Sequence, residues 1–168
     1  MSPVDVVSNT SPLIYLALLN RFALLKQLFG VVYVPDAVVK EVTVRGSGQP
    51  GADETDAALE AGWMKSIAVQ NRIAVDGLLD ELHLGEAEAI VLARELNIQR
   101  ILLDDRAARR KAAIMALSPT GTIGVLLLGK ARGELIDIRH DLDRLIAENF
   151  RISPRLYAEL VGDNNVGS

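Results

Sequence analysis

Two adjacent aspartates, Asp104 and Asp105, end an aliphatic run and are followed at once by a segment rich in alanine and arginine. Neighbouring carboxylates repel: about 5 Å apart, at an effective dielectric constant of about 20, they do so by roughly 3 kcal/mol. Asp105 alone has a simple explanation, because aspartate is a common N-cap of a following helix. The pair therefore needs either separate structural roles or a shared cation.

Two further acids occupy positions from which they can join this pair. Glu86 lies in the first turn of a strong helical pattern, where the helix dipole alone favours a carboxylate, and Glu41 lies on a short amphipathic segment that is by default surface. If the strands before them are parallel, the strand ends and helix starts converge at one edge of the sheet. Four unpaired carboxylates there would oppose folding by an amount comparable with the whole stability of a domain. The pattern predicts a cleft that binds a cation.

The available ligands indicate which cation. The chain has no cysteine, and its two histidines, His83 and His140, have no partner at metal-ligand spacing, so both are expected to be structural or exposed. Oxygen ligands alone favour Mg²⁺ or Mn²⁺ over zinc or copper. Such ions activate water and stabilise charge on phosphoryl oxygens, so the predicted chemistry is phosphodiester hydrolysis. The predicted metal ligands are Glu41, Glu86, Asp104 and Asp105.

The elements that must position these acids alternate between strand and helix. This alternation predicts an α/β fold of three layers (α/β/α), with a central, mostly parallel sheet of about four to five strands. Residues 70–81 have too weak a pattern for a firm assignment. Strands are expected at 4–7, 30–35, 63–69, 100–103 and within 118–122, and helices at 11–28, 36–44, 52–62, 84–96, 106–116, 123–131 and twice within 138–160.

Length and composition limit the classes of protein. The 168 residues, 49% of them hydrophobic, predict a single domain over 1–168 with a C-terminal helical segment at about 138–162. The net charge of −4 means that nucleic acid would have to bind through local basic patches or a bound cation. The lack of cysteine, of a basic leader and of any run of roughly 20 apolar residues predicts a cytoplasmic protein without a membrane span.

Five segments in order resemble one known family: "VSNTSPLIYLA", "VPDAVVKEV", "GEAEAIVLAREL", "ILLDDRAAR" and "TGTIGVLLLGKARG". They resemble the PIN-domain family, and within it the VapC-like group that opens with "TSPLI". The resemblance covers almost the whole chain. It implies a parallel sheet flanked by helices, an acidic site for Mg²⁺ or Mn²⁺, and ribonuclease activity as the toxin of a toxin–antitoxin pair.

The resemblance also assigns roles by position. The first acid of the family falls on Asn9, the second on Glu41, the third on Glu86 and the last on Asp105, with Asp104 beside it, and these five form the predicted catalytic set. Thr10 and Ser11 match the small polar residues that follow the first acid, where they hold the turn or meet a substrate phosphate.

Asn9 departs from the family pattern, because an amide offers a neutral carbonyl oxygen where an aspartate offers a charge. Two hypotheses follow. The first is a metal-dependent endoribonuclease that cleaves single-stranded RNA and has a cognate antitoxin. The second is a catalytically weakened PIN module that binds RNA or an antitoxin-like partner. A homodimer is expected from the resemblance and from apolar residues of the C-terminal helices, which burial within the monomer explains equally well: Leu142, Leu145, Ile146, Leu156 and Leu160.

Three other patterns in the sequence bear on these hypotheses. Arg106 and Arg110 are expected either to contact RNA phosphates or to lie on a solvated helix face opposite a row of alanines. The segment "GSGQPG" at residues 46–51 matches a dinucleotide-binding loop by letters, but it follows a helical pattern and is assigned as an ordinary loop. Paired aspartates also occur in phospho-acceptor receiver domains, which place them after the first strand and require a late lysine where this chain has "SPTGT".

Overall fold

A five-stranded parallel sheet forms the centre of the computed structural model, which describes residues 3–162. The strand order is β3-β2-β1-β4-β5, and every neighbouring pair is parallel. This confirms the predicted α/β class with its central parallel sheet. The strands are β1 (Val6–Ser8), β2 (Val32–Pro35), β3 (Met64–Ile67), β4 (Arg100–Leu102) and β5 (Ser118–Thr120).

Strand β1 lies in the middle of the sheet, and its position determines where a site can form. Val7 pairs with Tyr33 of β2 on one side and with Ile101 of β4 on the other, and Val6 and Val7 are fully buried. The chain leaves β1 toward β2 and later returns to the opposite side of β1 as β4. In open parallel sheets the crevice at such a switch point, beyond the carboxyl ends of the strands, is the usual place for a ligand. Asn9 and Asp104 follow the ends of these two strands.

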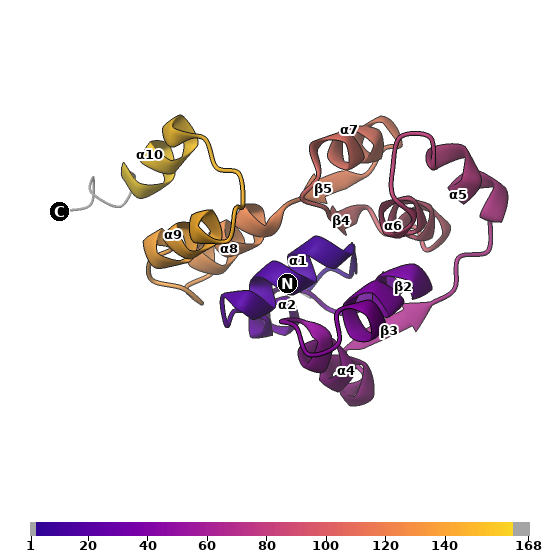
Figure 1. The fold of residues 1–168 in the computed structure, drawn as a ribbon, viewed down its shortest axis with the longest axis horizontal. Helices are drawn as coiled ribbons and strands as arrows, with labels where there is room; N and C mark the ends of the chain where they lie inside the picture. Colours follow the sequence, from indigo (N-terminus) through magenta and orange to yellow (C-terminus); the bar gives the residue numbers. More distant parts are fainter. Residues whose placement is uncertain (1–2, 163–168) are drawn as a thin grey trace. The chain divides into compact units, whose positions relative to one another are not determined.

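Helices cover both faces of the sheet. In Figure 1, α5, α6 and α7 lie on one side of the strands, and α1, α2 and α4 lie on the other. The arrangement confirms the predicted three layers. The helices of this part of the chain are α1 (Thr10–Leu18), α2 (Ala23–Leu28), α3 (Asp36–Val39), α4 (Ala52–Ala61), α5 (Arg72–Leu78), α6 (Leu84–Glu95) and α7 (Arg106–Ile114), with a π-helix, η1 (Lys40–Arg45), directly after α3.

Helix α6 is the most deeply buried helix segment near the predicted site. It packs against β1, β2 and β4, and all residues from 85 to 93 are buried. Two acids, Glu86 and Glu88, are buried within it and are 6% and 5% exposed. A buried carboxylate is costly unless it is hydrogen-bonded or paired, so both need explicit partners.

Three local predictions were wrong in detail. The helix expected at residues 11–28 is two helices, separated where Asn20 adopts a left-handed conformation with φ of 58°. The first of them starts at Thr10, one residue earlier than expected, so Asn9 occupies the N-cap position. Residues 70–81, left unassigned, contain α5, whose start is capped by a hydrogen bond from the Ala74 N–H to Oδ1 of Asn71 (3.0 Å).

The chain divides into two compact units, residues 1–122 and residues 123–168, with the division inside the first turn of α8 (Thr122–Ala131). The second unit also contains α9 (Arg139–Ala147) and α10 (Pro154–Gly162), which confirms the two helices expected within 138–160. Ser153 caps α10 by accepting a hydrogen bond from the Leu156 N–H (3.0 Å). Leu142 and Leu145 are fully buried, so the homodimer prediction keeps support only from the more exposed Ile146, Leu156 and Leu160. Among the described residues, no helix has the length and apolarity needed to cross a bilayer.

Candidate acidic site

Asn9 occupies the turn between β1 and α1. Its backbone N–H donates to the carbonyl of Leu102 in β4 (3.0 Å), and its own carbonyl accepts from Oγ of Ser8 (2.9 Å). These bonds attach the turn to the neighbouring strand. The Asn9 side chain is only 5% exposed and makes no capping bond to α1, although Asn9 is the N-cap residue. Its amide group is thus not needed to cap the helix and can serve a site.

Glu41 reaches the same turn from the opposite side. It lies in η1, where the Gly46 N–H bonds to the Glu41 carbonyl five residues earlier (3.0 Å), the wide spacing that defines a π-turn. Single π-turns inside helices are frequent at functional sites because they change the direction of a side chain. The hydroxyl of Thr10 donates to Oε2 of Glu41 (2.9 Å). Thr10, predicted to contact substrate or to hold the turn, makes a bond that fits the second role.

Gly85 shows how closely Asn9 and Glu41 approach α6. A methyl group at position 85 would lie 3.2 Å from Oε2 of Glu41 and 3.3 Å from Oδ1 of Asn9. Both distances are shorter than ordinary van der Waals contact with a carbon atom. Glycine at this position therefore leaves room for two oxygen atoms, carried by two different segments, beside the start of α6.

Glu86, the next residue, is held by its own helix start. Its Oε1 accepts a hydrogen bond from the His83 N–H (3.0 Å), which satisfies one of the free N–H groups of the helix terminus. Burial raises the pKa of the Glu86 carboxyl, and the nearby charges of Asp105 and Glu41 raise this pKa further, although the bond from His83 opposes them. Glu86 thus interacts electrostatically with Asp105 and Glu41, which lie on two other segments.

The two aspartates after β4 have different environments. Asp105 is exposed and caps α7, with Oδ2 accepting from the Ala108 N–H (3.0 Å). Asp104 uses both oxygens within the protein: Oδ1 accepts from the Thr122 N–H and Oδ2 from the Thr122 hydroxyl, each at 2.7 Å. Burial raises the pKa of Asp104 despite these two bonds and the opposing charge of Arg109. Asp104 therefore holds the chain at Thr122 and has less capacity for a cation than Asp105.

The oxygen atoms of these residues are possible ligands of a hard divalent cation. Glu41, Glu86 and Asp105 each have one oxygen bonded within the protein and one that has no hydrogen-bond partner among the described residues. Together with the amide oxygen of Asn9, these are oxygen ligands of the kind that Mg²⁺ and Mn²⁺ prefer. Within residues 3–162, however, the acids and histidines form no ready cluster of three or more that could hold a metal ion.

The remaining predicted residues lie at the edge of this arrangement. Arg106 and Arg110 are on the exposed surface of α7, and Ser11 is partly buried in the first turn of α1. The arginine that interacts electrostatically with an acid of the pair is Arg109, which lowers the pKa of Asp104 and was not predicted. Only its spacing of five residues from Asp104 could have suggested it, and the neighbouring arginines made that signal ambiguous.

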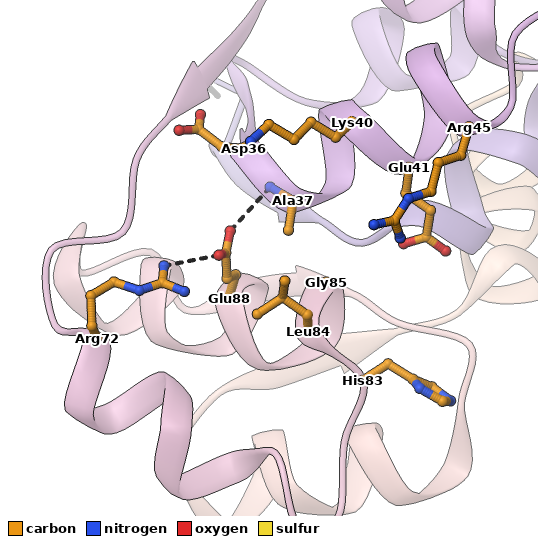
Figure 2. A pocket seen from close by; sticks show the side chains of 10 residues that line it. All are labelled: Asp36, Ala37, Lys40, Glu41, Arg45, Arg72, His83, Leu84, Gly85 and Glu88. Carbon is orange, nitrogen blue, oxygen red and sulfur yellow. Dashed lines mark hydrogen bonds and ion pairs between the residues drawn. The ribbon is translucent and has the colours of Figure 1, made fainter.

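A pocket of about 710 Å³ opens beside the acids and shares Glu41 and Gly85 with them. Figure 2 shows Glu41 projecting from η1 on one wall and Gly85 on α6 on the other. Glu88 lies in this pocket, where it accepts hydrogen bonds from the Ala37 N–H (3.1 Å) and from Nη1 of Arg72 (2.9 Å). We name this space, lined also by Lys40, Arg45, His83 and Leu84, the flanking pocket.

Sequence reasoning did not identify the flanking pocket. Glu88 offered a signal, because a second acid two residues after Glu86 in an apolar helix requires a buried partner. That partner, Arg72, lies in α5, for which no element was assigned. No local pattern connects the two residues, which are separated by 16 positions.

Fold and site together define the class: an α/β protein in which an amide and an acid that follow parallel strands, Asn9 and Asp105, are accompanied by two acids of adjoining helices, Glu41 and Glu86. The family comparison agrees, since a model described as a PIN domain matches residues 5–165. The chain belongs to the PIN-domain family and has its nuclease-type fold. None of the curated proteins compared with the chain matches it.

Proposed function

We propose that the chain is a metal-dependent endoribonuclease that hydrolyses phosphodiesters in single-stranded RNA, as the toxin of a toxin–antitoxin pair. One observation carries the proposal: Oδ1 of Asn9 and Oε2 of Glu41 both lie within 3.3 Å of the methyl position that Gly85 leaves vacant. Two segments distant in the sequence thus direct oxygen atoms to the start of α6. Glu86, in the first turn of this helix, interacts electrostatically with both Glu41 and Asp105.

Each residue has a role that its contacts support. Thr10 fixes the orientation of the Glu41 carboxylate, and the His83 N–H fixes that of Glu86. Asp105 presents its second oxygen from the start of α7. Asp104 is a positioning residue that acts through Thr122.

Glu41, Glu86 and Asp105 would hold the cation, with Asn9 as a neutral fourth ligand. Mg²⁺ or Mn²⁺ supplies, when bound, the Lewis acidity that activates water and stabilises charge on phosphoryl oxygens. The protein contributes two buried ligands, Asn9 and Glu86, which are at most 6% exposed, and two exposed ones, Glu41 and Asp105, each of which is held by a hydrogen bond to one of its oxygens. Rigid placement of this kind is what allows a site to favour the transition state over the bound substrate.

Cleavage of a labelled single-stranded RNA with Mn²⁺, Mg²⁺ or EDTA tests the proposal. Wild type is expected to cleave only with a divalent cation. Asp105→Asn is expected to cleave RNA 100-fold more slowly or worse. Removal of an electrostatic catalytic group usually lowers kcat by about 10²–10³. Because asparagine is also a good N-cap, this variant keeps the bond to Ala108 and should retain the thermal stability of wild type. Intact RNA under every metal condition, with folded wild-type protein, would refute the nuclease.

The amide at position 9 supports a second candidate, a PIN module that binds RNA or an antitoxin-like partner with little cleavage. An aspartate at this position would add a charged ligand beside Glu41, and the Asn9 side chain has no capping role to lose. Under the second candidate, Asn9→Asp raises the cleavage rate by at least tenfold at saturating Mn²⁺. Under the first, the rate is unchanged or falls. The same titration gives the metal affinity, which should rise in either case.

A further inference from the structure

The flanking pocket adjoins the acidic site and has a size suited to part of a ligand. Its volume of about 710 Å³ falls within the range of small-molecule sites, ≈ 300–1,000 Å³. Glu41 and Gly85 belong to both, so the pocket directly adjoins the acidic site (Figure 2).

The charges that line the pocket divide into paired and unpaired groups. Arg72 forms an ion pair with Glu88 (2.9 Å), and Glu88 also accepts the Ala37 N–H, so this acid is neutralised in place. Asp36 accepts a hydrogen bond from the hydroxyl of Ser66 (2.9 Å). Lys40 and Arg45, by contrast, are exposed, and their side chains make no hydrogen bond or ion pair to any described residue.

Lys40 and Arg45 flank Glu41 on the same π-helix. Glu41 therefore projects toward the acidic site from an element whose two neighbouring cations line the pocket (Figure 2). The lining also offers apolar surface at Ala37 and at Leu84, which is 44% exposed. A ligand that matches this lining has a negative group for the cations and a flat apolar body for Leu84.

We propose that the flanking pocket binds the nucleotide next to the scissile bond of a single-stranded RNA, with its phosphate against Lys40 and Arg45 and its base or ribose against Leu84. The inference rests on the proposed nuclease function and extends it to a substrate subsite. A polynucleotide fits better than an acidic peptide, because the reacting group at the acidic site and the anion in the pocket must belong to one chain. A single-stranded RNA has a phosphate at every nucleotide, so one strand supplies both the reacting phosphodiester and the neighbouring anion.

The test measures binding and cleavage separately. Binding of a short fluorescein-labelled single-stranded RNA is followed by anisotropy in EDTA, where no cleavage occurs, over a range of salt concentrations. Lys40→Ala and Arg45→Ala are each expected to weaken binding three- to tenfold and to reduce the slope of log K against log salt by about 0.7, the contribution of one phosphate contact to a single strand. In cleavage with Mn²⁺, each should raise KM with little change in kcat.

Lys26→Ala is the matched control, since Lys26 is an exposed lysine at the end of α2 and does not line the pocket. It should leave affinity and salt slope unchanged. Pocket variants that behave like Lys26→Ala while wild type cleaves RNA would overturn the subsite and leave the nuclease standing. Wild-type binding that depends on Lys40 and Arg45, without cleavage in any metal, would refute the nuclease and with it the substrate subsite, and would leave only an RNA-binding pocket. Equal displacement of the RNA by a poly-aspartate peptide would indicate a general anion site and would also overturn the subsite.

Discussion

Single carboxylates in this protein have distinct functions that depend on how many of their oxygens the protein already uses. Asp104 has both oxygens bonded to Thr122, whereas Glu41, Glu86 and Asp105 have one each bonded among the described residues. Two adjacent aspartates can therefore be retained without a shared ligand, because one faces inward to an anchor and the other caps a helix. The two aspartates are adjacent in the sequence, but their different hydrogen bonds give them different roles.

Glu86→Gln tests the electrostatic cost of the site. The folded pKa of Glu86 is raised above 4.5, so the stability linked to its protonated form is present at low pH and is lost as pH rises through the folded pKa. Glutamine cannot ionise but can still accept the His83 N–H. In EDTA at neutral pH, Glu86→Gln should melt a few degrees above wild type, since about 1 kcal/mol corresponds to roughly 2–4 °C at this size. The difference should vanish near pH 4 in thermal melts.

Glu54→Gln provides the control for this measurement. Glu54 makes the equivalent bond at the start of α4, to the Gly51 N–H (2.9 Å), but lies in a more exposed position. Its replacement should leave the melting temperature nearly unchanged at both pH values. A gain of the same size in both variants would mean that the helix start, and not the acidic site, is the source of the effect.

Thr122→Val tests the anchor at Asp104. Valine keeps the shape of threonine and the backbone N–H but removes the hydroxyl, which leaves Oδ2 of a poorly exposed carboxylate without its bond. An unsatisfied buried acceptor costs about 1–3 kcal/mol, so urea unfolding should show a loss of that size. Thr122→Ser should restore most of it. Stability equal to wild type in the valine variant would contradict the assignment of Asp104 as an anchor.

At the scale of elements, the periodicity of the sequence predicted the sheet well because the strands are short apolar runs bounded by turns. It also predicted that Asn9 and the aspartates follow strand ends. It could not predict α5, whose segment has only Val75 fully buried, or the π-helical spacing of η1, which the residue pattern does not distinguish from an α-helix. The sequence could not predict the flanking pocket either, because Arg72 and Glu88 are brought together only by the packing of α5 on α6.

The start of α6 makes a prediction about an element rather than a single charge. Alanine at position 85 should favour the helix by up to about 1 kcal/mol through propensity alone, yet its methyl group would press on Asn9 and Glu41. We therefore expect Gly85→Ala to fold with near wild-type stability and to lose at least tenfold in cleavage and in Mn²⁺ affinity. Gly77 in α5 faces open space, so Gly77→Ala should stabilise the protein and leave cleavage unchanged. Equal activity in the two variants would contradict the close approach at Gly85.

For the whole molecule, the net charge of −4 opposes the approach of a polyanion. Attraction must then be local, from cations such as Lys40 and Arg45 and from a divalent ion among the acids. The carboxylates of the acidic site also repel one another in the folded state, since Glu41 and Asp105 both raise the pKa of Glu86. Any cation that binds only the folded chain releases this repulsion and shifts the folding equilibrium.

Thermal unfolding in a Mn²⁺ titration tests that coupling. A ligand present at about 100 times its Kd stabilises the folded state by about 2.7 kcal/mol, which corresponds to a rise of roughly 5–10 °C for a chain of this size. Wild type should show a saturable rise of this order, reversed by EDTA. Asp105→Asn should reduce the rise because it removes one ligand charge. In EDTA its melting temperature should be no lower than that of wild type, because asparagine keeps the cap and the repulsion of Glu86 is relieved. Lys26→Ala should reproduce the wild-type titration. A melting temperature indifferent to Mn²⁺ up to millimolar concentration would mean that these acids are not a metal site, whatever activity the protein has.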